Sequence, residues 1–237
     1  MRRLPEILIG TFILLAVFMN LVAVILPAVP SAREAARNTA TRNDLKHIGI
    51  VLHNFTDEHG HLPTEVVSDN QPAMSWETQL LPWIEQQALF DAIDKSLPWD
   101  DPSNRTVFTS SILPFQSPNL PTNLIASSEH GLTGFSANKE IINDTKTMTF
   151  SDIKDGFSQT FFAAEIRENY PPWGKPGNFR DLTLGLNTSP DGFGSHFRNG
   201  VNFVMADGKV IQLKEDTDIS ILKALSSPNG SETVKEF

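Results

Sequence analysis

The chain has 237 residues, a net charge of −9 and no cysteine. This length suits one ordinary domain plus an anchor. The lack of cysteine excludes disulfides, thiolate nucleophiles and cysteine-ligated zinc or iron–sulfur sites. An acidic chain without a dense cluster of Lys and Arg repels phosphate backbones, so we expect no nucleic-acid partner.

The first element along the chain is an uncharged, mostly aliphatic run. Residues 7–32 carry no charge, and a bilayer core of ~30 Å needs about 20 helical residues. We therefore predict a transmembrane helix over residues 7–29 (Ile7–Val29), preceded by a short N-terminal segment, residues 1–6. A cleaved secretory signal is the alternative, but such signals have shorter apolar cores of roughly 7–15 residues.

The flanking charges do not fix the orientation of this predicted span. Arg2 and Arg3 precede it and favour a cytoplasmic N-terminus under the positive-inside rule. Four basic residues on the other side argue against that orientation: Arg33, Arg37, Arg42 and Lys46. Charge alone therefore leaves the orientation open.

The next segment has the pattern of an amphipathic helix. Its apolar residues repeat at helical spacing and form one stripe: Leu45, Ile48, Leu52 and Phe55. Gly60 and Pro63 are typical of a helix end. We predict that residues 30–60 continue the helix and pack on a globular domain formed by residues 61–237.

That domain contains signals for both helices and strands. Trp76–Lys95 favours a second helical region with a break at Pro82, and Thr160–Ile166 favours a buried strand. Short strand candidates lie within residues 138–150. Loops are expected at residues 64–75, 96–123 and 171–194, of which the last two are rich in proline.

The clearest strand signal comes near the C-terminus. Val201–Ala206 and Lys209–Leu213 are apolar runs on either side of Asp207-Gly208. An Asp-Gly pair in this position predicts a hairpin with a type I′ turn, which needs positive φ at both turn residues. Both faces of the hairpin carry large apolar groups, so we expect cover on both sides, by the amphipathic helix on one. The predicted fold class is α+β, with a long N-terminal helix packed on an antiparallel β-sheet.

Many short motifs, in order, resemble a large bacterial family of pilin-like proteins described as prepilin-type processing-associated, with a His-(nine residues)-Asp-Gly signature. The matching segments are Leu26–Val29, Ala32–Arg37, Asn43–Gly49, Leu52–Phe55, Leu80–Phe90, Pro98–Asp100, Ile153–Thr160, Pro172–Pro176 and Gly200–Gly208. The resemblance implies a pilin-like fold like that of the major pseudopilin of type II secretion, with the N-terminus cytoplasmic and the globular domain periplasmic or extracellular.

The chain departs from this family pattern at three places. His196 precedes Asp207-Gly208 by ten intervening residues rather than nine. Pro5-Glu6 and Gly10 stand where the family has its cleavage glycine-phenylalanine and its assembly glutamate, so we expect neither prepilin cleavage nor assembly through that glutamate. Gln116-Ser117-Pro118 replaces the usual Cys-Pro-Ser.

Three residue sets are candidate sites. Four aspartates have the oxygen chemistry of a Ca²⁺ site: Asp152, Asp155, Asp191 and Asp207. The densest cluster of nitrogen and oxygen ligands is His53, Asp57, Glu58, His59 and His61, although its spacing matches no established metal site. His196 and Asp207 are a candidate acid–base pair, and the alternative is that Asp207-Gly208 is simply the hairpin turn.

No constellation typical of an enzyme is present, because the chain lacks Gly-x-Ser-x-Gly, His-Glu-x-x-His and a glycine-rich phosphate loop. We therefore expect a non-catalytic, membrane-anchored pilin-like structural or interaction protein without a required cofactor. Its expected partners are the lipid bilayer and other pilin-like subunits or secretion-system components. The alternative is a tethered periplasmic module that binds Ca²⁺ or a glycan and does not assemble; tryptophans 76, 83, 99 and 173 are candidates for a glycan-binding face.

Overall fold

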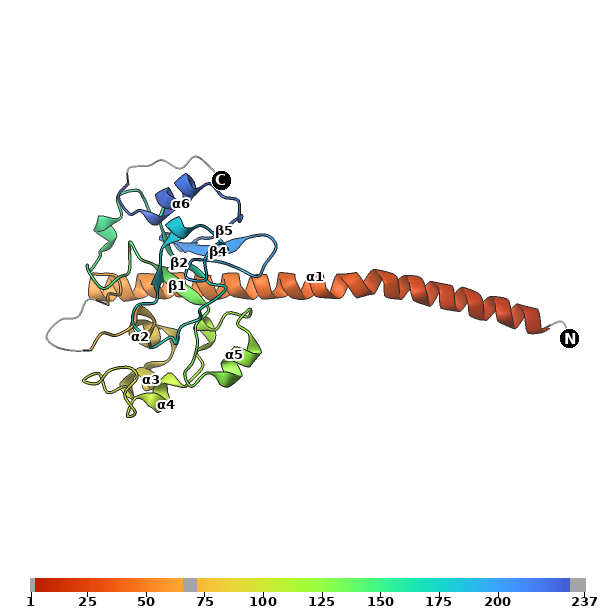
Figure 1. Ribbon diagram of the computed structural model, residues 1–237, viewed down its shortest axis with the longest axis horizontal. Helices are drawn as coiled ribbons and strands as arrows, with labels where there is room; N and C mark the ends of the chain where they lie inside the picture. Colours follow the sequence, from red (N-terminus) through yellow and green to blue (C-terminus); the bar gives the residue numbers. More distant parts are fainter. Residues whose placement is uncertain (1–2, 66–71, 231–237) are drawn as a thin grey trace. The chain divides into compact units, whose positions relative to one another are not determined.

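The computed structural model describes residues 3–65 and 72–230, without the side chains of residues 3–10 and 21–28. The chain divides into two compact units, residues 1–39 and residues 40–237. One helix, α1 (Arg3–His59, 57 residues), begins in the first unit and ends in the second. The helix continues without interruption through Pro27 and Pro30, as the predicted continuation over residues 30–60 requires (Figure 1).

The helix of the first unit has an exposed apolar segment. The large hydrophobic side chains between Phe12 and Met19 are 57–76% exposed. Within the described residues, no helix reaches the combination of length and hydropathy that marks a membrane span. Part of the predicted transmembrane helix, residues 7–10 and 21–28, has side chains outside the described residues.

In the second unit, the apolar stripe of α1 is the centre of a core. Leu45, Ile48 and Leu52 are fully buried and Phe55 is nearly so. The helix ends at His59 and is followed by Gly60 at φ +74°, a conformation that glycine adopts without strain. The predicted amphipathic stripe and its glycine stop are therefore confirmed.

Five strands form one sheet in the order β3-β1-β2-β4-β5. The strands are β1 (Phe135–Asn138), β2 (Phe161–Glu165), β3 (Phe179–Arg180), β4 (Val201–Met205) and β5 (Val210–Leu213). β1–β2, β2–β4 and β4–β5 are antiparallel, but β1 and β3 are parallel. The prediction of a purely antiparallel sheet was therefore wrong at one edge. The chain reverses after β2, so β3 returns along the outer side of β1 in the direction of β1.

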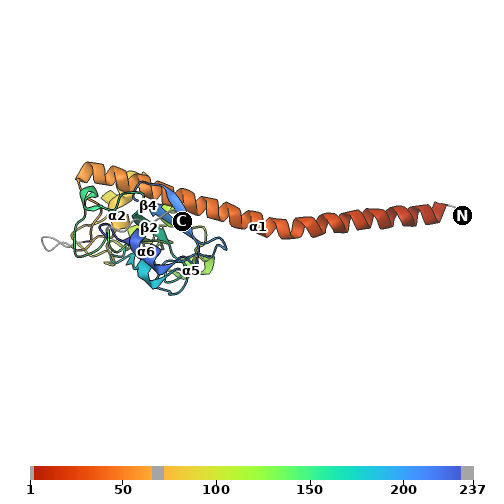
Figure 2. The same cartoon turned by 90° about the horizontal axis from the view of Figure 1, so that it is seen from above.

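The sheet is covered on both faces, as expected for its apolar hairpin. Phe162 and Val204 point into the same core as the α1 stripe. Phe161 and Phe203 point into a second core, to which α6 (Ile219–Ser226) contributes Leu222 and Leu225. In the view from above, α1 and α6 lie on opposite sides of the strands (Figure 2).

The part of the chain that connects α1 to β1 contains short helices. The predicted helical region Trp76–Lys95 is confirmed as far as Asp91, as α2 (Trp76–Leu80), η1 (Leu81–Ile84) and α3 (Gln87–Asp91). The break predicted at Pro82 is only a change from α2 to the 3-10 helix η1, which contains Pro82, and the helical run is interrupted instead at Glu85, where φ is +62°. The expected loop at residues 96–123 also contains helical turns: α4 (Arg105–Phe108), η2 (Leu113–Phe115) and the start of α5 (Thr122–Ser127). Within the expected loop 64–75, residues 66–71 lie outside the described residues.

Two expected segments near the sheet also differ in detail. Residues 138–150 contain only the end of β1 and the start of η3 (Phe150–Asp152), because β1 begins earlier, at Phe135. The expected loop 171–194 contains β3 and η4 (Leu182–Leu184).

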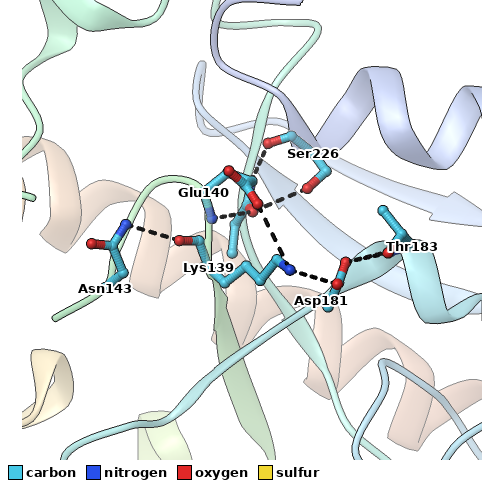
Figure 3. Close-up of polar contacts among 7 residues, drawn as sticks. Lys139, Glu140, Asn143, Asp181, Thr183 and Ser226 are labelled. Carbon is cyan, nitrogen blue, oxygen red and sulfur yellow. Dashed lines mark hydrogen bonds and ion pairs between the residues drawn. The ribbon is translucent and has the colours of Figure 1, made fainter. Parts of the chain in front are cut away.

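A polar network fixes the end of β1 (Figure 3). The buried Asn138 side chain donates to the carbonyl oxygens of Phe161 and Ser226, each at 2.9 Å, and so joins β1 to β2 and α6. Lys139 Nζ lies 2.5 Å from Asp181 Oδ2, and Asp181 caps η4 by accepting from Thr183 N at 2.8 Å. These bonds hold the β3 side of the sheet and α6 in place.

Candidate functional site

The two parts of the predicted His–Asp pair lie at opposite ends of β4. His196 precedes the strand and Asp207 follows it. Five strand residues at ~3.3 Å each separate the two ends by on the order of 15 Å. The structure therefore does not bring His196 and Asp207 together, and each has to be considered with its own neighbours.

Asp207 and Gly208 form the β4–β5 turn. The predicted hairpin is confirmed, with Val204 opposite Val210, but the predicted type I′ turn is wrong. Only Gly208 has positive φ, at +76°, and its N–H donates to Met205 O at 2.8 Å. These features define a type I turn followed by a glycine bulge, which places three residues in the loop.

Helix α1 binds this turn through backbone carbonyls of the hairpin. Lys46 Nζ donates to Gly208 O at 2.7 Å, and His53 Nε2 donates to Ala206 O at 2.7 Å. At Gly49, between them, an added Cβ would lie 2.7 Å from Val204 Cγ2. Glycine at this position therefore permits the close approach of helix and hairpin that both bonds require. We call Lys46, Gly49, His53 and the Ala206–Gly208 turn the helix–hairpin junction.

His196 lies in a surface pocket of about 670 Å³ on the opposite end of β4. The pocket, here called the His196 pocket, is lined by Pro121, Leu124, Ser127, Ser128, Leu132, Arg167, Glu168, Asn169, Tyr170 and His196. The Tyr170 hydroxyl lies 3.3 Å from His196 Nε2 and hydrogen-bonds to it. The volume of the pocket is in the range of small-molecule sites.

Two ionisable groups of the His196 pocket, His196 and Tyr170, favour their neutral forms. Partial burial, with a further contribution from the nearby Arg167, lowers the pKa of His196, so the imidazole is neutral at pH 7. Burial, together with the nearby Glu165 and Glu168, raises the pKa of Tyr170 to about 12. The pocket thus presents a neutral hydroxyl–imidazole pair.

A buried arginine fixes the wall of this pocket. Arg180, which is 8% exposed, donates to the carbonyl oxygens of Glu168 and Asn169, each at 2.9 Å. It also donates to Pro190 O at 2.9 Å and Gly192 O at 2.6 Å. Asn169 itself has φ +50°, an uncommon conformation for a residue other than glycine, which marks sites held by their surroundings.

Three carboxyl groups are buried near the sheet. Burial raises the pKa of Glu165 to about 8, opposed by hydrogen bonds from Asn202 and Ser195. Burial also raises the pKa of Glu65 to about 7, although its carboxylate accepts from the backbone N–H groups of Gly177 and Trp76. Glu165 lies on β2, where its Oε1 accepts from Asn202 N at 2.7 Å and Asn202 Nδ2 at 2.8 Å.

The third buried carboxyl group, Glu77, has no exposed surface. Burial raises its pKa well above the usual value, despite hydrogen bonds from Asn178 and Thr133. Asn178 Nδ2 lies 3.0 Å from each Glu77 carboxylate oxygen. These carboxyl groups act as hydrogen-bonding groups within the fold, and none of them is among the residues that line the His196 pocket.

The four candidate Ca²⁺ ligands are held by different local partners. Asp152 caps η3 by accepting from Thr149 N at 2.8 Å, and Asp207 accepts from Lys209 N at 2.9 Å within the hairpin turn. The other two bonds are Gly230 N to Asp155 Oδ2 at 2.6 Å and Asn169 Nδ2 to Asp191 Oδ1 at 2.7 Å. Among the described residues, no three His, Asp or Glu side chains are grouped to hold a metal ion.

The side chains of the candidate ligand cluster at the end of α1 also have different neighbours. His53 faces the hairpin and the ring of Phe150, 4.9 Å away between centroids. His59 stacks on Phe55 at 4.2 Å, and His61 approaches Phe55 edge-on at 5.9 Å, while Asp57 and Glu58 are exposed. The histidines therefore contribute packing and backbone hydrogen bonds in this structure.

Sequence reasoning missed most of the His196 pocket. Arg167 and Tyr170 lie in the loop after β2, whereas the α5 residues come from a distant segment, and the two share no motif. Arg180 gives no local signal either, because its partners are backbone carbonyls. Glu165 had a signal: it is the only charged residue in the apolar run Phe161–Ile166, which marks a buried carboxyl group.

Comparison with known proteins places the chain in a family. Residues 30–180 match the family described as "Protein of unknown function (DUF1559)", and the chain belongs to that family. The matched range includes α1 from Pro30 onward, β1 and β2, and ends at Arg180. No curated protein and no solved structure shows significant similarity to the chain.

Proposed function

We propose that the protein is a membrane-anchored, pilin-like structural or interaction protein, similar to a pseudopilin and without catalytic activity. The observation that carries this proposal is the exposed apolar helix between Phe12 and Met19. Its large hydrophobic side chains lie at positions 12, 13, 14, 15, 17, 18 and 19 and so point to all sides of the helix. A helix that is apolar all round needs lipid or apolar protein around it.

The second unit supports the pilin-like part of the proposal. Residues 40–59 present one buried stripe to a sheet, while Ile50 on the same helix is 48% exposed. The DUF1559 family is commonly associated with pilin-like proteins. On this proposal, residues 7–29 cross the inner membrane, residues 1–6 are cytoplasmic and the second unit is periplasmic or extracellular.

Membrane extraction tests the anchor. The full chain, expressed in bacteria, is expected to stay in the membrane pellet after washing at alkaline pH. Leu15→Arg should shift it toward the soluble fraction, because an arginine at a helix centre costs about 2.5–3.5 kcal/mol on insertion, whereas Leu15→Phe should not. Release of the unaltered chain by the alkaline wash would contradict the anchor.

Cross-linking tests the interaction role. The chain has no cysteine, so Ile50→Cys introduces a single reactive thiol on the exposed side of α1. An oxidant should produce covalent dimers or mixed disulfides in membranes with Ile50→Cys, but not with the control Lys223→Cys, which places a thiol on α6. Equal cross-linking at both positions, or none at Ile50→Cys, would count against an α1-mediated assembly.

The second candidate function is the tethered ligand-binding module, which holds Ca²⁺ or a glycan without assembling. The His196 pocket favours binding of an organic ligand within this alternative. The dispersed positions of Asp152, Asp155, Asp191 and Asp207 give no support to its Ca²⁺ form.

A further inference from the structure

The His196 pocket combines a fixed wall with unoccupied hydrogen-bonding capacity. Arg180 holds the backbone of Glu168 and Asn169 from behind, so the pocket is formed before any ligand arrives. A preformed wall lowers the ordering cost of binding. The strained backbone at Asn169 lies in this wall and is stabilised there by the Arg180 bonds.

The polar groups of the pocket mostly accept hydrogen bonds. The Ser127 hydroxyl donates a hydrogen bond to Leu124 O at 3.2 Å, and the Ser128 hydroxyl donates one to His130 O at 2.6 Å. Ser127 therefore presents oxygen lone pairs, and Ser128 Oγ keeps one lone pair besides the bond that it accepts from His130 N at 3.2 Å. The Tyr170 hydroxyl donates to Nε2 of the neutral His196 ring, whose other nitrogen bonds the backbone of Arg167, so the phenol oxygen still accepts hydrogen bonds. Glu168 adds an exposed carboxylate. An acceptor-rich pocket requires a ligand that is rich in donors.

The charges of the pocket favour a neutral ligand. Arg167 Nε lies 3.9 Å from Glu168 Oε1, and both side chains are about half exposed. The pair offers donors and acceptors together while its net charge is zero. An anion would face Glu168 and a chain of net charge −9, whereas a cation would face Arg167. Pro121, Leu124 and Leu132 supply an apolar surface for C–H groups.

We infer that the His196 pocket binds a neutral, hydroxyl-rich ligand, namely a saccharide. The hydroxyl groups of a saccharide can donate to the oxygens of Ser127, Ser128, Tyr170 and Glu168, and they can also accept from Arg167. The apolar face of a sugar ring suits Leu124 and Leu132. This inference gives the second candidate function a ligand class and a site, and it needs neither the membrane anchor nor assembly.

The test uses the single tyrosine of the chain. Tyr170 is the only tyrosine among the 237 residues, so labelling with ring-¹³C tyrosine gives NMR signals from the pocket alone. The full-length protein is kept in a detergent without a sugar headgroup, such as dodecylphosphocholine. It is titrated with maltotriose, cellobiose and N,N′-diacetylchitobiose, and with two charged relatives, digalacturonic acid and deacetylated chitobiose.

We expect saturable shifts of the Tyr170 signals with at least one neutral saccharide, and affinities at least about tenfold weaker for both charged relatives. Glu168→Gln should weaken binding of the neutral saccharide by about tenfold, equivalent to about 1.4 kcal/mol. Glu129→Gln, an exposed change outside the pocket lining, should not.

Three results would overturn the inference: no saturable shift with any neutral saccharide of the panel, equal binding of the charged relatives, or unchanged affinity in Glu168→Gln. Each is independent of membrane extraction and cross-linking. A failure here is therefore distinguishable from a failure of the proposed anchor or assembly.

Discussion

The buried Glu165 makes the stability of the fold depend on pH. Its carboxyl group keeps its proton in the folded protein up to a pKa of about 8, against a usual value of 4.5. The folded state therefore binds more protons than the unfolded state between these values, and the free energy of unfolding falls as pH rises. This contribution is fully present below pH 4.5 and is lost as pH rises toward 8.

The size of the effect follows from the two pKa values. One pKa unit corresponds to about 1.4 kcal/mol. Between pH 5 and pH 8, the free energy of unfolding of the wild-type protein should fall by about 3 kcal/mol through Glu165 alone. Glu165→Gln removes this loss, because the amide cannot ionise and its oxygen still accepts from Asn202 N and Nδ2.

The assay is urea unfolding of the full-length protein in detergent, followed by tryptophan fluorescence at pH 5 and pH 8. Two of the four tryptophans, Trp76 and Trp173, are fully buried and report on the second unit. From pH 5 to pH 8, the free energy of unfolding of Glu165→Gln should rise by about 3 kcal/mol relative to that of wild type. The exposed neighbour Glu168→Gln is the control. If wild type and Glu165→Gln gave parallel pH curves, the assignment of a protonated buried Glu165 would be refuted.

Three further predictions concern packing and loop order. Gly49→Ala would normally strengthen a helix, but here its Cβ would lie 2.7 Å from Val204 Cγ2, so we expect a loss of about 1–3 kcal/mol in urea unfolding; a gain would contradict the close approach. Lys46→Met should cost about 0.5–1.5 kcal/mol by removing the bond to Gly208 O, whereas the exposed Lys223→Met should cost almost nothing. Arg180→Met leaves its carbonyl partners without their buried donor and should cost at least about 3 kcal/mol, with broadened NMR signals from Tyr170; sharp, unshifted signals would show that Arg180 does not hold the pocket wall.

The parts of the fold that the sequence predicted well depend on local pattern. The α1 stripe is visible because Leu45, Ile48 and Leu52 recur at helical spacing, and one buried face is enough to specify it. The β4–β5 hairpin is visible because Asp207-Gly208 separates two apolar runs. The turn type was still wrong, because Ala206 joins the loop and only Gly208 needs positive φ.

The missed parts depend on pairing between distant segments. β3 has two residues, Phe179 and Arg180, and is a strand only because it pairs with β1. The His196 pocket is assembled from α5, the loop after β2 and the residues before β4, so no window of sequence contains it. The His196–Asp207 pair fails for a different reason: the strand that the sequence predicts at Val201–Ala206 lies between the two residues and holds them at its opposite ends.

The helix–hairpin junction has a mechanical consequence. Along α1, Arg42, Lys46 and His53 donate in turn to Val210 O, Gly208 O and Ala206 O. Because Gly49 lets the helix lie against Val204, residues 40–59 cannot slide along the hairpin without breaking these bonds. Tension applied to this part of α1 is therefore delivered in shear to the β4–β5 loop and then across the strand ladder. The fold therefore resists such a pull through several hydrogen bonds that must break together.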